Sequence, residues 1–203
     1  TAPKRKYTND YTLRREEAIA HILDAVGDAV IVATTGKTGR ELFELREKRG
    51  ADHAHDFLTV GSMGHAGAIA LGIALHRPQR RVIVLDGDGA ALMHMGALAA
   101  IGAAAPPNLV HILLNNEAHE SVGGAPTAAG SVNFPAVAAN VGYHVLPTAQ
   151  TADELTHALA QLHEMSALTF LEVRTAIGSR ADLGRPTTTP HENKEALMQT
   201  LRA

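Results

Sequence analysis

The sequence has no cysteine and no tryptophan, and only 3% of its 203 residues are aromatic. Without cysteine there is no disulfide, no thiolate metal site and no cysteine nucleophile. With few aromatic rings and a net charge of −3, the chain lacks the basic, stacking surface that nucleic acids require. It also lacks an apolar run of about 18 residues, and we expect no secretory leader. We therefore expect a cytoplasmic protein without nucleic acid or membrane as a partner.

Short apolar runs and helical segments alternate along the chain, which is 45% hydrophobic. The runs occupy residues 29–33, 57–60, 81–85, 109–114, 143–146 and 169–173. Their uniform apolarity is typical of strands that are covered on both faces. The clearest helix is predicted over 151–165, where Thr151 and Glu154 form a capping box. The pattern predicts one α/β domain over 1–203, a doubly wound, mostly parallel six-stranded sheet with helices on both faces.

Glycine and polar residues follow four of the predicted strands, in loops at 34–40, 61–65, 87–89 and 115–116. Ligands of such sheets bind beyond the carboxyl ends of the strands, and glycine lets a backbone approach a phosphate closely. Gly87-Asp88-Gly89 and Asn115-Asn116 place a carboxylate and a carboxamide at neighbouring strand ends. Together these groups are suited to hold a hard cation that bridges a bound diphosphate.

Each of these residues also has a simpler interpretation. Asp88 alone is an ordinary helix N-cap, and asparagines are common in turns after buried strands. Lys37 suits a solvated helix start, and a P-loop is disfavoured because Ile31 stands where its upstream glycine would be. His65 and His119, both in these loops, are either packing residues or proton donors.

The chain resembles the cofactor-binding domain of thiamine-diphosphate-dependent 2-oxo acid decarboxylases. The resemblance covers about residues 30–173 and rests on G-D-G at 87–89, N-N at 115–116 and G-S-M-G at 61–64. Within that family, the runs at 34–38, 61–66, 116–124 and 178–186 are most similar to phosphonopyruvate decarboxylases.

The resemblance implies thiamine diphosphate and Mg²⁺ as cofactors, with Asp88, Asn116 and the backbone carbonyl of Ala118 as metal ligands. Met63 matches the apolar wedge that bends the cofactor, and the carbonyl of Gly61 matches the acceptor for its aminopyrimidine. Glu117 departs from the family pattern, which has glycine after the two asparagines. The implied cofactor-binding residues are Gly61, Ser62, Met63, Gly87, Asp88, Gly89, Ala90, Asn116 and Ala118.

The implied reaction converts 3-phosphonopyruvate to phosphonoacetaldehyde and carbon dioxide. Thiamine diphosphate acts as an electron sink in such reactions. The substrate carries a carboxylate and a phosphonate, so its site needs fixed cations. The implied substrate-binding residues are Lys37, Thr38, Arg180 and Arg185, unless these are only surface residues. His119 is the candidate proton donor and, with Met63 and Gly61, makes up the predicted catalytic set.

The resemblance also implies a pyrimidine-binding domain that supplies an activating glutamate. Such a domain needs about 150 further residues, and only about 25 precede the first predicted strand here. We expect it on a separate partner subunit, which makes a hetero-oligomer; the alternative is that this chain is a fragment of a longer one. Two alternatives stay open: the beta subunit of a sulfopyruvate decarboxylase, and a noncatalytic, regulatory subunit that binds thiamine diphosphate.

Overall fold

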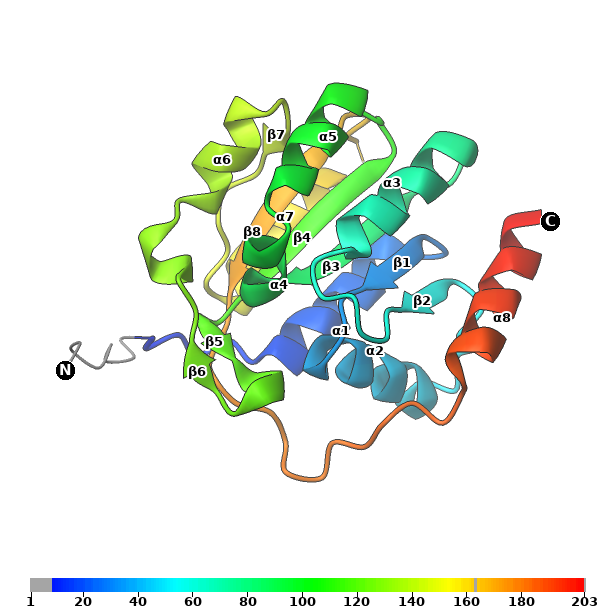
Figure 1. Ribbon diagram of the computed structural model, residues 1–203, viewed down its shortest axis with the longest axis horizontal. Coiled ribbons are helices and arrows are strands. Elements are labelled where there is room, and N and C mark those ends of the chain that lie inside the picture. Colours follow the sequence, from blue (N-terminus) through cyan, green and yellow to red (C-terminus); the bar gives the residue numbers. More distant parts are fainter. Residues whose placement is uncertain (1–8, 163, 203) are drawn as a thin grey trace.

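A parallel β-sheet forms the centre of the molecule (Figure 1). The structure, a computed structural model, describes residues 9–162 and 164–202. Six strands pair in the order β2-β1-β3-β4-β8-β7, and every neighbouring pair is parallel. The strands are β1 (Val30–Ala33), β2 (Asp56–Leu58), β3 (Val82–Gly87), β4 (Leu109–Asn115), β7 (His144–Val145) and β8 (Thr169–Arg174). Each of the six predicted apolar runs overlaps one of them.

Helices cover both faces of this sheet, which confirms the predicted doubly wound α/β class (Figure 1). One face packs against α1 (Arg15–Val26), α2 (Lys37–Lys48) and α7 (Ala152–Leu162). The opposite face packs against α3 (Ala66–His76), α4 (Asp88–Met93), α5 (Gly96–Ala104) and α6 (Phe134–Asn140). A last helix, α8 (Pro190–Arg202), lies beside the edge strand β2.

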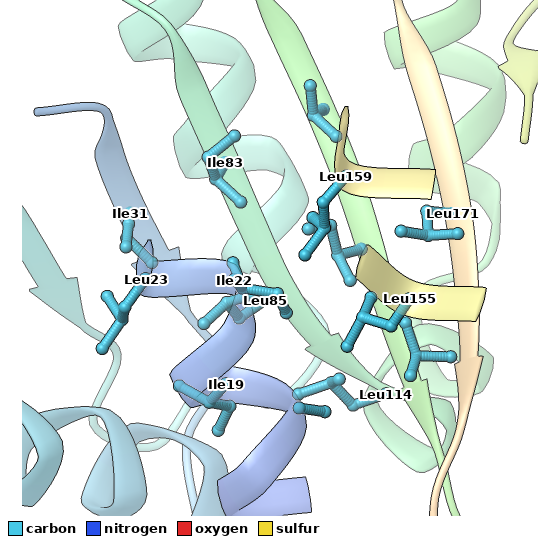
Figure 2. Close-up of a cluster of buried hydrophobic side chains, with 14 of the residues drawn as sticks. Ile19, Ile22, Leu23, Ile31, Ile83, Leu85, Leu114, Leu155, Leu159 and Leu171 are labelled. Carbon is cyan, nitrogen blue, oxygen red and sulfur yellow. The ribbon is translucent and has the colours of Figure 1, made fainter. Parts of the chain in front are cut away.

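Alternation along each strand divides the core between the two faces. In β3, Ile83 and Leu85 point to the face covered by α1 and α7, whereas Val82 and Val84 point to the other. Figure 2 shows the first cluster, where Ile19 and other side chains of α1 meet the sheet. Full burial of each such aliphatic side chain stabilises the fold by about 1.5–3 kcal/mol. Two-sided burial explains why the central strands β1, β3, β4 and β8 are mostly apolar.

Thr151 and Glu154 form the predicted capping box before α7. The Thr151 hydroxyl accepts from the Glu154 amide at 3.2 Å, and the Glu154 carboxylate accepts from the Thr151 amide at 3.2 Å. These reciprocal bonds satisfy backbone amides that the first helical turn leaves without partners. The sequence signal for this helix start is therefore confirmed.

The order of the strands fixes where a ligand site can form. From β1 the chain passes to β2 on one side, whereas β3 leads to β4 on the other side. The loops that follow β1 and β3 therefore diverge at the carboxyl edge of the sheet and leave a crevice between them. This switch point lies between two of the glycine-containing loops that the sequence singled out.

Two irregular segments lie at the same edge. After β4 the chain forms a small antiparallel hairpin of β5 (Ala118–His119) and β6 (Ala125–Pro126), with short 3-10 helices η1 (Glu120–Val122) and η2 (Ala129–Ser131). After β8, residues 177–189 cross to α8 as an extended segment, here called the strap (Figure 1, orange). Among the described residues, no helix is both long and apolar enough to cross a membrane.

Candidate functional site

A cavity opens at the carboxyl ends of β1, β3 and β4, at the switch point of the sheet. Its walls come from the loops after these strands, from Arg15 at the start of α1 and from the turn before α3. The predicted site residues that line this first cavity are Lys37, Thr38, Met63, Gly87, Asp88, Gly89, Ala90, Asn116, Ala118 and His119. Residues up to 82 positions apart in the sequence thus meet at one place.

Four predicted residues lie elsewhere. Gly61 and Ser62 precede Met63 in its turn and are exposed, with φ of 70° and 45°. Arg185 lines a neighbouring cavity beneath the strap. Arg180 lines neither cavity, because its guanidinium pairs with the carboxylates of Glu16, Glu44 and Asp182.

Asp88 is the buried carboxylate of the first cavity. It starts α4 immediately after β3 and is only 2% exposed. Burial raises the pKa of Asp88, while hydrogen bonds from the Thr127 hydroxyl and the Asn116 amide, and the nearby His119, oppose this shift. The Thr127 hydroxyl donates to Oδ2 at 2.5 Å. The shift is upward overall, so these donors do not compensate fully for the lost hydration of the carboxylate.

The two asparagines after β4 have different tasks. Asn115 Nδ2 donates to Glu172 at 2.7 Å, which ties the strand end to β8. Asn116 Nδ2 donates to Glu120 Oε2 at 2.8 Å, and its Oδ1 accepts from the Ala118 amide at 3.1 Å. The second lone pair of that carboxamide oxygen is therefore available for a cation. Only Asn116, of the two, lines the cavity.

Glu117 adopts the backbone conformation that glycine usually provides. Its φ is +62°, a left-handed conformation that costs a residue with a side chain about 1–3 kcal/mol. Its carboxylate pairs with Arg174 at 3.1 Å, and its carbonyl accepts from the Thr127 amide at 2.9 Å. Glutamate thus adopts here a turn conformation that suits glycine, and the flanking Asn116 and Ala118 both line the cavity.

Two glycines allow close approach around the cavity. A Cβ on Gly89 would lie 2.5 Å from the His119 ring, and a Cβ on Gly36 would lie 2.3 Å from the Ser121 hydroxyl. Any side chain at either position would displace the β5–η1 segment. Glycine therefore lets that segment fold against the loops that follow β1 and β3.

A buried charge network borders the cavity, and sequence reasoning missed it. Arg15 donates to both oxygens of Glu41, at 2.7 and 2.9 Å, and also to Glu120. Burial works to lower the pKa of Arg15, but the two carboxylates outweigh it and raise the pKa. For Glu41, burial raises the pKa, and this effect is larger than the opposite effect of Arg15. These residues lie on separate elements, and no local pattern marks them.

The candidate histidines separate clearly. His119 lines the cavity beside Asp88. His65 lies outside it, with Nδ1 3.1 Å from the Ser62 carbonyl and its ring 4.0 Å from that of His94. Within the described ranges, no group of three histidine, aspartate or glutamate side chains is placed to hold a metal ion. A metal here would instead need amide or backbone oxygens.

The donor chemistry of the first cavity fits a magnesium diphosphate. Asp88 offers a buried carboxylate and Asn116 an oriented carboxamide oxygen, and Mg²⁺ prefers such hard oxygen ligands. The raised pKa of Asp88 shows that its charge lacks a full counterpart, which a cation would supply. Thr34 adds a buried hydroxyl with no hydrogen-bond partner among the described residues, at the same wall.

Residues 34–173 match the family model described as thiamine pyrophosphate enzyme, C-terminal TPP binding domain. The chain belongs to this family, and its cofactor is therefore thiamine pyrophosphate, also called thiamine diphosphate. Mg²⁺ is a separate question, because the family match by itself shows no metal.

Individual relatives agree with the family. A phosphonopyruvate decarboxylase of Streptomyces hygroscopicus is 46% identical over 164 residues, which are 81% of this chain and 39% of the relative. A sulfopyruvate decarboxylase subunit beta of Methanothermobacter thermautotrophicus is 38% identical over 143 residues, 70% of this chain and 72% of that subunit. The crystal structure of benzoylformate decarboxylase from Polynucleobacter necessarius superposes with a TM-score of 0.70 at 16% identity, covering 88% of this chain and 36% of that one. This last likeness shows the fold alone. The chain spans about two fifths of the length of the phosphonopyruvate decarboxylases it matches.

Proposed function

We propose that this chain is the cofactor-binding part of a decarboxylase that converts 3-phosphonopyruvate to phosphonoacetaldehyde and carbon dioxide. The observation that carries the proposal is the convergence of Asp88, Asn116 and Met63 on one cavity, in a chain 46% identical to a phosphonopyruvate decarboxylase. Phosphonate biosynthesis is the setting that this substrate implies.

The proposed roles follow the chemistry of each group. Asp88, Asn116 and the carbonyl of Ala118 hold Mg²⁺, while the amides of Gly89 and Ala90 bind the diphosphate. Ser62 and Gly87 complete the cofactor contacts around them. When bound, thiamine diphosphate supplies the electron sink for the loss of carbon dioxide.

Two residues of the turn before α3 position the cofactor. Met63 presents its apolar side chain to the cavity as the wedge beneath the ring system. The Gly61 carbonyl accepts a hydrogen bond from the aminopyrimidine. Positive φ at Gly61 and Ser62 reverses the chain just before Met63, which supports this placement of the turn.

Residues near the mouth of the cavity are proposed to donate the proton and to bind the charged groups of the substrate. His119 is the proposed proton donor, because its ring lines the cavity beside the Asp88 carboxylate and an imidazole can carry a proton to a bound group. Lys37 and Thr38, at the start of α2, and Arg185, on the strap, are the proposed substrate contacts. Arg180 is not carried into this set, because its three carboxylate partners already neutralise it.

The proposed partner is a pyrimidine-binding domain that brings the activating glutamate. The relatives support a domain beyond this one, since the chain matches only 39% of the Streptomyces hygroscopicus protein and a related chain is named as a subunit. With such a partner the active site would lie between two unlike chains, and the assembly would be a hetero-oligomer.

Carbon dioxide release tests the proposal. The chain is co-expressed with a pyrimidine-binding subunit, supplied with Mg²⁺ and thiamine diphosphate, and offered 3-phosphonopyruvate, sulfopyruvate and pyruvate in parallel. We expect turnover that is selective for 3-phosphonopyruvate and absent without the partner. Cofactor binding without release from any of the three substrates would contradict the proposal and favour a regulatory, noncatalytic subunit.

Sulfopyruvate is the second candidate substrate. The chain is 38% identical over 143 residues to a sulfopyruvate decarboxylase subunit beta and covers 72% of it, which supports sulfopyruvate as a candidate. A sulfonate has nearly the shape of a phosphonate but carries one charge instead of two. Selective turnover of sulfopyruvate in the same assay would keep the reaction and replace the substrate.

A further inference from the structure

A second cavity lies beneath the strap and adjoins the first. Its volume is about 430 Å³, within the range of small-ligand sites. The start of α2, the end of β2 and the strap enclose it, and Lys37 and Ser121 line both cavities. A group bound here would therefore sit next to anything bound in the first cavity.

Three cations line this strap cavity without an acidic partner. Lys37 Nζ donates to the Ser179 hydroxyl at 2.6 Å, and Arg40 donates to the backbone carbonyls of Leu183 and Gly184. Among the described residues, no carboxylate forms an ion pair with Lys37, Arg40 or Arg185. The cavity therefore carries an excess of positive charge.

The one acidic residue in its lining is already engaged. Glu120 accepts hydrogen bonds from Arg15, from Asn116 Nδ2 at 2.8 Å and from the Gly178 amide at 2.5 Å. Its charge is thus largely neutralised by Arg15 and by these two hydrogen-bond donors. Three cations against one satisfied carboxylate leave the cavity suited to an anion.

Ion pairing on the strap keeps the other nearby acids away from the cavity. Arg180 binds Glu16, Glu44 and Asp182, and Glu44 also accepts from the Gly184 amide. The same contacts fasten the strap to α1 and α2. Arg180 and Arg185, only five residues apart, therefore have opposite surroundings: one is neutralised and the other is unpaired.

We infer that the strap cavity is a subsite for a doubly charged tetrahedral anion and receives the phosphonate group of the substrate. This inference rests on the proposed function, and it places the selectivity for phosphonate over sulfonate in the strap cavity. The three cations attract a dianion more strongly than a monoanion of the same shape, because each electrostatic attraction scales with the charge of the ligand. Arg40 joins Lys37 and Arg185 in the set, and the subsite lies apart from the proposed diphosphate position at the start of α4.

Calorimetric titration of the 203-residue chain tests the subsite without any turnover. Methylphosphonate and methanesulfonate are titrated separately at pH 8, where the phosphonate is doubly charged. Arg185 is the residue to change, because it lines only the strap cavity and is exposed, so the fold does not depend on it. Arg202→Gln is the matched control, since it removes one exposed positive charge from the last turn of α8.

We expect methylphosphonate to bind at least ten-fold more tightly than methanesulfonate. Arg185→Gln should weaken methylphosphonate binding at least ten-fold, whereas Arg185→Lys should retain most of the affinity and Arg202→Gln all of it. Equal affinities for the two ligands, no effect of Arg185→Gln, or no binding to the unchanged chain would each overturn the inference.

The two proposals fail separately. If methylphosphonate binds as expected but the assembled enzyme releases no carbon dioxide, the subsite stands and the proposed reaction falls. If the enzyme decarboxylates 3-phosphonopyruvate while Arg185→Gln leaves methylphosphonate binding unchanged, the reaction stands and the phosphonate lies elsewhere.

Discussion

Asp88 illustrates a conflict between ligand binding and stability within one residue. The fold buries its carboxylate at the switch point of the sheet and raises its pKa above the ordinary value of 3.8. The neutral form is favoured in the folded chain, so its stabilising contribution is fully present below about pH 4 and is lost as the pH rises through the folded pKa. The charged form of Asp88 in the metal-free chain is therefore one that its surroundings solvate poorly.

Asp88→Asn should separate the two effects. In metal-free chain at pH 7 we expect the variant to be more stable than the unchanged chain by about 1 kcal/mol, the usual size of a single-site gain. Below about pH 4 the difference should disappear. Urea unfolding at several pH values measures it, with Asp153→Asn, an exposed position, as the control.

The same variant should lose its response to the cofactor. Mg²⁺ with thiamine diphosphate should raise the unfolding temperature of the unchanged chain, since a ligand that binds only the folded state stabilises it. Asp88→Asn should show a much smaller rise. A full response in the variant would remove Asp88 from the proposed metal site.

The site residues that belong to a sequence motif could be predicted. Those that form ion pairs with residues far away in the sequence could not. Asp88 and Asn116 stand directly after apolar strands, so sequence alone placed them at one sheet edge. Arg15 and Glu120 are 105 residues apart and are charged, and such residues are normally expected on the surface. Likewise, nothing in the sequence of the strap separates Arg180 from Arg185, because their difference lies in partners on α1 and α2.

At the scale of elements, α8 protects the edge of the sheet through one side chain. Asn193 accepts from the Leu58 amide at 2.9 Å and donates to the Asp56 carbonyl at 2.8 Å. These are the two bonds that a further strand would make with β2. An unpaired edge invites association with other chains, and the carboxamide closes part of it.

Asn193→Ala should therefore destabilise the chain by about 2 kcal/mol, because it leaves two buried backbone groups without partners. Urea unfolding measures the loss, and light scattering should show increased self-association through β2. Gln199→Ala, at an exposed position of the same helix, serves as the control and should change neither property. A loss equal to that of the control would mean that water replaces the side chain at the edge.

The elements themselves were predictable where they are long or buried. The central strands β1, β3, β4 and β8 are buried and mostly apolar, so they were visible in the sequence. The short edge strands β2 and β7 overlap the two remaining apolar runs. The β5–β6 hairpin was not visible, because two-residue strands are too short to show a period. That hairpin carries Ala118 and His119, so the least predictable element of the fold holds two of the proposed site residues.

At the scale of the whole molecule, exposed apolar side chains lie around the two cavities. Val60 is 69% exposed and lines the strap cavity, and Val122 is 68% exposed and lines the first cavity. Solvent-exposed aliphatic groups near a ligand site are typical of a surface that another protein covers. This position agrees with the proposed pyrimidine-binding partner.

Hydrogen exchange tests that surface. Adding the partner subunit should slow amide exchange in residues 58–63 and 118–124, because these segments become buried. Residues 105–108, which precede β4 at the opposite edge of the sheet, should exchange as before. Protection at 105–108 with none around the cavities would place the partner on the wrong side of the molecule.

The strap gives this fold room to evolve. Its backbone adds no strand to the sheet, and its fixed points are the buried Leu183 and the ion pairs of Arg180. Arg185 is exposed and does not hold the strap in place, so substitutions there change the charge of the strap cavity with little effect on folding. With the proposed subsite in the strap cavity, selection can alter the preferred acid by changing a segment outside the core, while the residues of the first cavity stay the same. Divergence of substrate preference within such a lineage should accumulate on the strap before it reaches the strand ends.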